Sequence, residues 1–197
     1  RHDLIFSWDE SNWSERYGLQ RGVAWGEVGA GQPVVRTDFQ PDSKSYSILA
    51  LLSCFGLVGY WSKEGGFRAE DLKVVMADMR DGTGGMIAPL PTHCWTLADN
   101  CSTHHVSGIK ETLLDAGISC IDNAPFSPWN NPPELFFKDW KQDLRVHRNE
   151  CLELRREFGS AGVQLALRRS AFRVSEDNFA GYYRKCGLWR GVPGVEE

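Results

Sequence analysis

The chain has 197 residues, of which 42% are hydrophobic and 24% are charged, and its formal net charge at neutral pH is −4. These values are ordinary for one globular domain with a sizeable core. No apolar run approaches the roughly 18 residues that a membrane-spanning helix needs, and no signal peptide precedes Asp9. We therefore expect an intracellular protein that does not bind a membrane.

The net charge is distributed unevenly along the chain. Residues 1–137 hold 10 Lys and Arg against 17 Asp and Glu, which gives −7, whereas residues 138–197 hold 12 against 9, which gives +3. The C-terminal part is therefore expected to carry positive potential that attracts a polyanion, although a solvated helical surface has a similar composition.

The six cysteines show no paired spacing and lie mostly in apolar surroundings. This usage predicts reduced thiols in an intracellular protein rather than a disulfide framework. The alternative is a zinc site that includes Cys94, Cys101 and His104, but Cys94 is expected on a strand where it faces away from Asp99. The cysteines are Cys54, Cys94, Cys101, Cys120, Cys151 and Cys186.

The first half of the chain is predicted to consist mainly of strands. Alternating apolar residues and glycine-rich turns predict strands over 4–8, 45–53 and 56–61, a hairpin with arms 23–25 and 33–37, and a helix over 69–80. The second half is predicted to contain strands over 93–98 and 118–121 and helices over 105–116, 132–147, 150–158, 163–168 and 175–186. Strands, then a βαβ unit, then helices indicate an α/β fold with a mixed β-sheet flanked by helices.

Three carboxylates follow buried elements or turns. Asp9 follows the apolar run from Leu4, Asp99 ends the run from His93, and Glu134 closes a proline-rich segment that begins at Pro125. Asp9 and Asp99 are expected to end neighbouring strands, so that their carboxylates emerge at one edge of the sheet, and Glu134 is expected on a helix packed there. Three such carboxylates can hold two divalent cations against a phosphodiester.

The sequences around these acids resemble the catalytic domain of mariner-type transposases and their bacterial insertion-sequence relatives, which are DDE endonucleases. The first motif is Asp-Glu-Ser-Asn-Trp from Asp9, and the second is Asp99-Asn100 followed by His104. The third is Pro-Phe-Ser-Pro-Trp-Asn-Asn-Pro-Pro-Glu from Pro125 to Glu134, with Phe126 where the family has tyrosine. The 34 residues between Asp99 and Glu134 are a separation typical of the group.

The resemblance implies an RNase H-like fold and a transposase that cleaves DNA at transposon ends and transfers the strands to target DNA. Asp9, Asp99 and Glu134 would be catalytic residues and the ligands of two Mg²⁺ ions, or of Mn²⁺ in their place. Asn100 and His104 would orient metal-bound oxygens or the DNA phosphate, although His104 is equally suited to cap the following helix.

The resemblance also implies partners and a domain organisation. The partners would be double-stranded DNA, both transposon ends and target, and a second copy in a homodimer. The location would be the nucleus of a eukaryote or the cytoplasm and nucleoid of a bacterium. Residues 1–147 would form the catalytic domain and residues 148–197 a helical extension packed on it. The family's end-recognition modules normally precede this region, so we expect this chain alone to lack specific end recognition.

Two of the acids have alternative interpretations. Glu134 would lie at the third position of a helix with Asn131 as N-cap and Pro132 at its first position, and so would suit a capping box. Glu10 is a rival to Asp9 as a ligand, but strand alternation lets only one of the two face the site, which favours Asp9.

The helix after Glu134 carries a basic stripe formed by Lys138, Lys141 and Arg145. This stripe is a candidate track for the DNA backbone, and the alternative is a plain ion pair between Glu134 and Lys138. Trp129 is a candidate for stacking on a base. Five further arginines extend the basic surface: Arg155, Arg156, Arg168, Arg169 and Arg173.

Two other functions fit the same sequence. One is a catalytically silent, transposon-derived protein that has kept the fold and serves as a DNA-binding or scaffolding module. The other is an unrelated RNase H-like nuclease that acts on structured or hybrid nucleic acid. The proline-rich turn before Glu134 argues against the latter.

Overall fold

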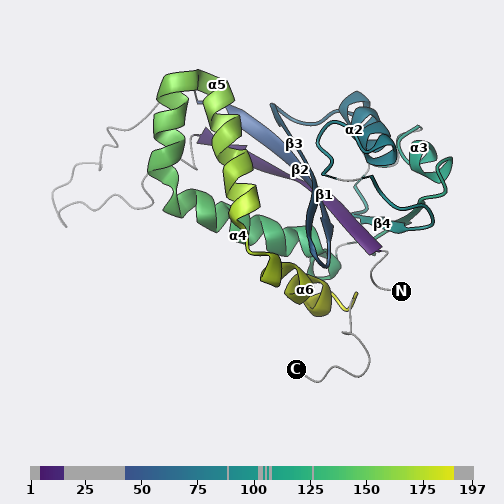
Figure 1. The fold of residues 1–197 in the computed structure, drawn as a ribbon. Coiled ribbons are helices and arrows are strands. Elements are labelled where there is room, and N and C mark those ends of the chain that lie inside the picture. The colour runs from purple at the N-terminus through teal and green to yellow at the C-terminus, as the bar shows by residue number, and fades with distance from the viewer. Residues whose placement is uncertain are drawn as a thin grey trace, which may run out of the picture.

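The computed structural model describes residues 5–15, 43–87, 89–101, 104, 106, 108–125 and 127–188. Within these residues the strands form one five-stranded sheet in the order β3-β2-β1-β4-β5 (Figure 1). The strands are β1 (Ile5–Ser14), β2 (Ser45–Ser53), β3 (Gly56–Glu64), β4 (Trp95–Ala98) and β5 (Ser119–Asp122).

The strand directions decide where the predicted acids lie. β1 is antiparallel to β2, with Asp9 opposite Ala50, and β2 is antiparallel to β3. β1 is parallel to β4, with Trp8 opposite Ala98, and β4 is parallel to β5. Because Trp8 is in register with Ala98, Asp99, the residue that follows β4, lies beside Asp9 in the middle of β1.

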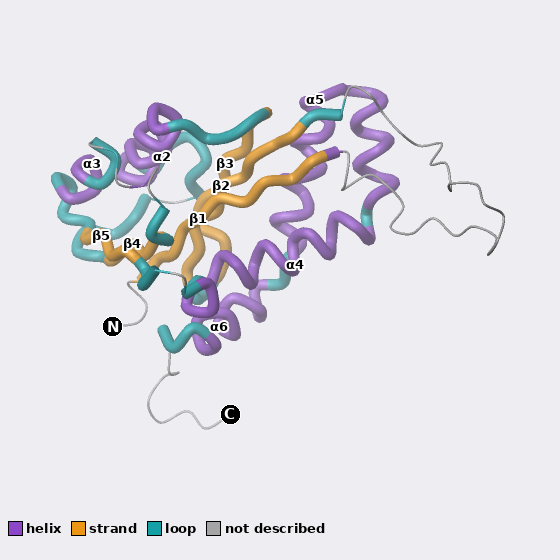
Figure 2. Tube along the Cα trace, turned by 180° about the vertical axis from the view of Figure 1, so that it is seen from behind, coloured by secondary structure: helices purple, strands orange, loops and turns teal. Residues whose placement is uncertain are grey.

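Helices cover both faces of the sheet. α4, α5 and α6 lie together on one side, and α2 and α3 lie on the other (Figures 1 and 2). The helices are α2 (Ala69–Asp81), α3 (Glu111–Leu114), α4 (Pro132–Val146), α5 (Arg148–Arg173) and α6 (Glu176–Lys185), and a 3₁₀ turn, η3, spans Pro128–Asn130. The predicted α/β arrangement of a mixed sheet flanked by helices is confirmed.

Side chains of β1 contribute to two core clusters, one on each face of the sheet. Trp8 packs with Leu72 and Met76 of α2, whereas Trp13 packs with Phe136 and the other apolar residues of α4 on the opposite face. The apolar stripe of α4 is buried as predicted, because its residues recur at helical spacing toward the sheet. α4 is thereby held across the strand that carries Asp9.

The predicted helices over 69–80 and 132–147 agree closely with α2 and α4. Two other predictions were wrong. The predicted strand over 4–8 continues to Ser14, because Trp13 packs on Tyr46 of β2 at a ring-centroid distance of 6.1 Å. The predicted helix over 105–116 is reduced to the short α3, since Gly108 has a φ of 89°, which interrupts a helix.

The C-terminal helices also differ from the prediction. α5 contains two helical segments joined at Gly159, whose φ of 59° and ψ of −134° are non-helical, and the second segment continues to Arg173. Figure 1 shows that these segments turn back on each other. The predicted hairpin over 23–37 lies outside the described residues.

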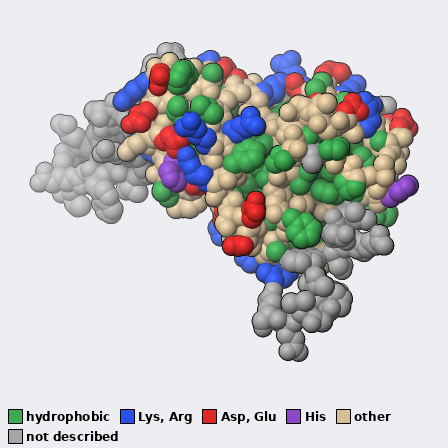
Figure 3. Space-filling model, in the orientation of Figure 1, with side chains coloured by type: hydrophobic (Ala, Val, Ile, Leu, Met, Phe, Trp, Pro, Cys, Tyr) green, Lys and Arg blue, Asp and Glu red, His purple; other side chains and the backbone are tan. Residues whose placement is uncertain are grey.

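The face of the molecule in Figure 3 mixes apolar and charged side chains. Figure 3 shows apolar side chains gathered between α5 and α2, with acidic and basic side chains interspersed around them. All six cysteines are free thiols, as predicted. Among the described residues, no helix combines the length and apolar character required to cross a membrane.

Candidate active site

Asp9 lies within β1, and its carboxylate is held from two directions. The side chain is 7% exposed. Its Oδ1 accepts a hydrogen bond from the backbone N–H of Glu10 at 2.7 Å, and its Oδ2 accepts one from the Asn131 amide at 2.7 Å. The Oδ1 of Asn131 in turn accepts a hydrogen bond from the Ser7 hydroxyl at 3.3 Å. These bonds attach the start of α4 to β1.

Burial raises the pKa of Asp9 to about 7, and the negative charges of Asp99 and Glu134 act in the same direction. The backbone N–H of Glu10 and the charge of His104 oppose the increase without cancelling it. Both distant carboxylates are therefore close enough to act on Asp9. A buried acid that is costly to ionise beside two others favours the binding of a cation.

Asp99 follows β4 and is paired with His104. The Oδ1 of Asp99 lies 2.8 Å from Nδ1 of His104, and Nε2 of the same ring lies 3.5 Å from Oε2 of Glu10. The ring is fully buried against Trp8, with the two ring centroids 4.5 Å apart. Burial lowers the pKa of His104, but its contacts with Asp99 and Glu10 outweigh burial and raise the pKa to about 10. The ring of His104 therefore lies between two carboxylates.

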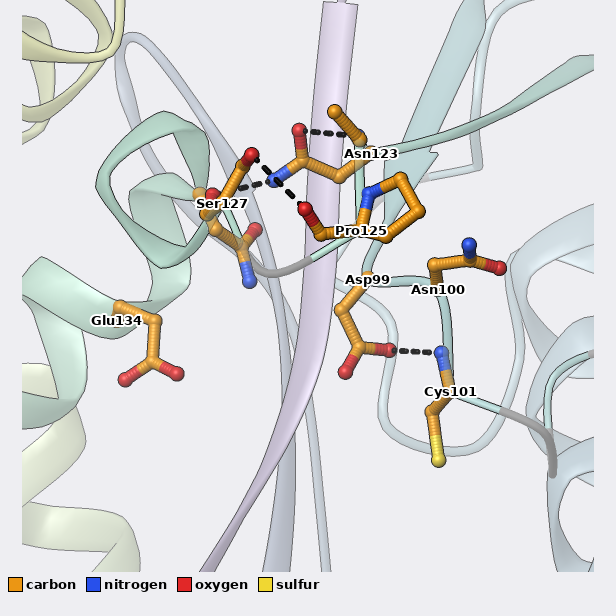
Figure 4. A pocket seen from close by; sticks show the side chains of 9 residues that line it. Asp99, Asn100, Cys101, Asn123, Pro125, Ser127 and Glu134 are labelled. Carbon is orange, nitrogen blue, oxygen red and sulfur yellow. Dashed lines mark hydrogen bonds between the residues drawn. The ribbon is translucent and has the colours of Figure 1, made fainter.

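Glu134 lies in the first turn of α4, where it is exposed. Glu134 and Asp99 both line a cavity of about 360 Å³, and Figure 4 shows their carboxylates on opposite sides of it, with β1 running between them in this view. Asn100 and Cys101 line the side of Asp99. Asn123 follows β5 and donates a 2.9 Å hydrogen bond to the carbonyl of Ser127, which fixes the loop above the cavity.

The chemistry of this donor set fits a divalent cation. Carboxylate oxygens are the ligands that Mg²⁺ prefers, and Asp9, Asp99 and Glu134 would supply them. Within the described part of the chain, however, no group of three His, Cys, Asp or Glu side chains is placed as a ready-made metal site. The carboxylates would therefore have to close around the cation. The same finding gives no support to the zinc alternative that includes Cys94, which is buried.

The alternative interpretation of Glu134 as part of a capping box with Asn131 is wrong. Asn131 precedes α4 but makes no side-chain cap, because its amide is engaged with Asp9 and Ser7. Glu10 contacts His104, and the preference for Asp9 over Glu10 as a metal ligand stays a prediction. His104 is bound to Asp99 rather than acting only as a helix cap, and the role of Asn131 was missed because the Asn-Pro pair has an ordinary helix-start pattern.

The basic stripe lies along α4, with Lys138 and Arg145 exposed and Lys141 partly buried. Among the described ion pairs, none joins Lys138 to Glu134. The predicted DNA contacts of this stripe and of Trp129, which is 67% exposed, stay predictions. Of the further arginines, Arg155 is paired with Glu15, and both Arg169 and Arg173 are paired with Glu150.

Comparison with solved structures places this arrangement in a known fold. A Mos1 mariner paired-end complex with Mn matches with a TM-score of 0.66 and 16% identity over 96% of this chain. The Mos1 strand transfer complex matches with a TM-score of 0.60 and 13% identity over 93% of this chain. The fold is that of the Mos1 mariner transposase catalytic domain. The isolated Mos1 catalytic domain matches with a TM-score of 0.54 and 14% identity over 95% of this chain.

The chain spans only part of these proteins. It covers 54% and 52% of the chains in the two Mos1 complexes and 79% of the isolated Mos1 catalytic domain. No protein-family model matches the sequence, and no curated protein matches it. At these identities the similarity establishes the fold alone.

Proposed function

We propose that this protein is the catalytic domain of a DNA transposase, a DDE-type endonuclease that cleaves DNA strands at transposon ends and transfers them to target DNA in a metal-dependent reaction. The observation that carries the proposal is geometric: Asp99 and Glu134 line one cavity, and Asn131, which also lines it, is hydrogen-bonded to Asp9. The shared fold and the three motifs in the sequence support the same assignment.

Asp9, Asp99 and Glu134 would hold two Mg²⁺ ions, or Mn²⁺ in their place. When bound, such ions lower the pKa of the attacking water or 3′-hydroxyl and stabilise the leaving oxygen in an in-line displacement. Asn131 fixes Asp9, and His104 fixes Asp99, so two of the acids are held in position by the chain's own contacts. Asn100 lines the same cavity and would contact a phosphate oxygen there.

DNA would lie along α4. Lys138, Lys141 and Arg145 would contact the phosphates of double-stranded DNA and hold the scissile bond at the three acids. The proposal includes a homodimer, so that two transposon ends can be joined, and an intracellular location in the nucleus or the nucleoid. It also retains residues 1–147 as the catalytic domain and 148–197 as an extension. α5 and α6 contribute apolar residues to the same core cluster as α4.

A catalytically silent DNA-binding module is the second candidate. It is favoured by the absence, within the described residues, of three ligand side chains already gathered for a metal ion. Such a protein would bind DNA through the same basic stripe without cutting it.

A plasmid-nicking assay with Mg²⁺ or Mn²⁺ separates the two candidates. The transposase proposal expects metal-dependent nicking that falls by about 100-fold or more in Glu134→Gln, since the substitution removes one charged ligand at an exposed position. Glu153→Gln is the matched control, because Glu153 is an exposed acid on α5 outside the cavity. Wild-type protein that binds DNA without nicking it in either metal would favour the silent module.

A further inference from the structure

A second cavity, of about 470 Å³, lies between the end of β1, the start of β2 and the last turns of α4. Among the described residues that line it, none is acidic, two are cationic and three carry uncharged polar side chains. Trp13 and Leu144, which are largely buried, provide its apolar wall. The other lining residues are Asn12, Ser14, Ser45, Lys141 and Arg145.

The opening of this cavity follows from the sheet register. β4 pairs with β1 only from Ile5 to Trp8, whereas β2 pairs with β1 as far as Ser14. In the described sheet, the part of β1 beyond Asp9 therefore has a strand neighbour on one side only. On α4, Lys141 and Arg145 border this uncovered part of the strand.

The charge of the cavity is not neutralised by the acids of α4. Asp139 contacts Asn178 and Tyr182 of α6, and Asp143 contacts Arg173 and His147. Among the described ion pairs, none involves Lys141 or Arg145, and the recorded hydrogen bond of Arg145 is a long one to Gln142 at 3.5 Å. Two cations beside hydroxyl and amide groups suit a phosphodiester chain.

Two independent distances place this cavity relative to the three acids. Asn12 and Ser14 lie about three to five residues beyond Asp9 on the strand, or about 10–17 Å at roughly 3.3 Å per residue. Lys141 and Arg145 lie about seven to eleven residues beyond Glu134 on the helix, or about 10–17 Å at roughly 1.5 Å per residue. Figure 2 shows β1 and α4 running side by side. At roughly 3.4 Å per base pair, this separation corresponds to about three to five base pairs of DNA.

We propose that this cavity binds the sugar–phosphate backbone of double-stranded DNA about three to five base pairs from the reacting phosphate. The inference rests on the proposed function, because it takes the three acids as the point at which the DNA reacts. Lys141 and Arg145 neutralise phosphates there, and Asn12, Ser14 and Ser45 hydrogen-bond to phosphate or sugar oxygens. Since these groups contact the backbone, the cavity binds DNA of any sequence.

The first test is the salt dependence of binding to a fluorescent duplex. Combining Lys141→Gln with Arg145→Gln is expected to raise the Kd roughly tenfold at about 100 mM salt and to reduce the slope of log K against log salt by about 2. The control combines Arg184→Gln with Lys185→Gln, which removes two positive charges at exposed positions on α6 outside the cavity and should change the Kd less than about twofold.

A further variant tests the cavity itself. Asn12→Asp places a negative charge among the lining residues at an exposed position and is expected to weaken binding at least as much as loss of one cation. Cavity variants that retain the wild-type melting temperature but bind with the Kd and salt slope of the control would overturn the inference.

The second test measures how many base pairs separate the phosphates bound in the cavity from the reacting phosphate. Duplexes in which single phosphates are replaced by neutral methylphosphonates are cut in the presence of Mn²⁺, and the interfering positions are counted from each cut. Wild-type protein should show interference about three to five base pairs from the cut, and the Lys141 and Arg145 double variant should lose it. Interference at other positions only would contradict the proposed distance between the cavity and the reacting phosphate. Wild-type protein that binds DNA but does not cut it would overturn the proposed function. The salt experiment would still show whether the cavity binds DNA.

Discussion

The amide of Asn131 donates a 2.7 Å hydrogen bond to Oδ2 of Asp9, although the two residues are 122 positions apart. Asn131 directly precedes α4, and its contact joins the helix that carries Glu134 to the strand that carries Asp9. The 2% exposure of Asn131 shows that this bond lies within the protein. The separation between two of the three acids is therefore controlled by a side chain that is not itself an acid.

Replacing Asn131 with alanine is expected to reduce metal-dependent cleavage about 10- to 100-fold, because the Asp9 carboxylate loses its orientation. It should also lower the free energy of unfolding by about 1–3 kcal/mol, since the buried Asp9 oxygen and the Ser7 hydroxyl lose a partner. Cleavage kinetics over a range of Mn²⁺ concentrations and urea unfolding measure both effects. Asn130→Ala is the control, and equal cleavage by the two variants would contradict the role of Asn131.

His104 should stabilise the fold in a pH-dependent way. Its pKa is raised to about 10 from 6.5, so the stabilisation is complete below about pH 6.5 and is lost as the pH rises toward 10. His104→Gln should therefore be less stable than wild type by about 3 kcal/mol at low pH, with a smaller difference at high pH. Urea unfolding across this range provides the measurement.

The control for that series is His93→Asn, because His93 is exposed and has a φ of 63° that asparagine tolerates. The difference in the free energy of unfolding between His93→Asn and wild type should stay nearly constant with pH. A His104→Gln difference that is equally constant would show that the ring is not held as an imidazolium.

Asp9 should bind a proton near neutral pH in the metal-free protein. Burial raises its pKa from the usual 3.8 to about 7, so between these pH values the folded state holds a proton that the unfolded state has released. The stability that Asp9 contributes is complete below about pH 4, falls as the pH rises to about 7, and changes little above that. Carbon NMR of the Asp9 carboxyl with a chelator present measures the titration.

Glu134→Gln should shift that titration to lower pH, because it removes one of the charges that raise the pKa of Asp9. Glu153→Gln should leave it unchanged. Adding Mg²⁺ to wild type near neutral pH should release a proton and raise the melting temperature. A titration of Asp9 near pH 4 in metal-free wild type would contradict the convergence of the three acids.

Gly159 is expected to be intolerant of substitution. Its φ of 59° and ψ of −134° lie in a region that glycine alone adopts readily, and a Cβ added there would meet nothing within 4 Å. Gly159→Ala should therefore destabilise the protein by about 1–3 kcal/mol through backbone strain alone. Gly181, within α6, also has open space but no positive φ. Gly181→Ala should stabilise by about 0.4–1 kcal/mol in the same denaturation assay, and equal effects would contradict the strain.

Local pattern was sufficient for much of the fold. The buried residues Phe136, Trp140 and Leu144 recur at helical spacing, and Asn131-Pro132 marks a helix start, so the sequence predicted α4 to within one residue. It also predicted the mixed sheet, because alternating apolar residues indicate strands wherever they occur. The helix predicted over 105–116 was too long. The apolar spacing favours a helix there, but Gly108 has a positive φ that a helix does not allow.

The sequence by itself determined which acids carry the proposed chemistry and which helix brings Glu134 to them, since motif and period are properties of neighbouring residues. Only the tertiary structure decided what each acid contacts. The partners of Asp9, Asp99 and Glu10 include side chains from other elements, Asn131 for Asp9 and His104 for the other two. Strand pairing likewise extended β1 past Asp9 and left the cavity beside Lys141 uncovered by β4. Such contacts depend on burial and register between distant segments, which no local pattern specifies.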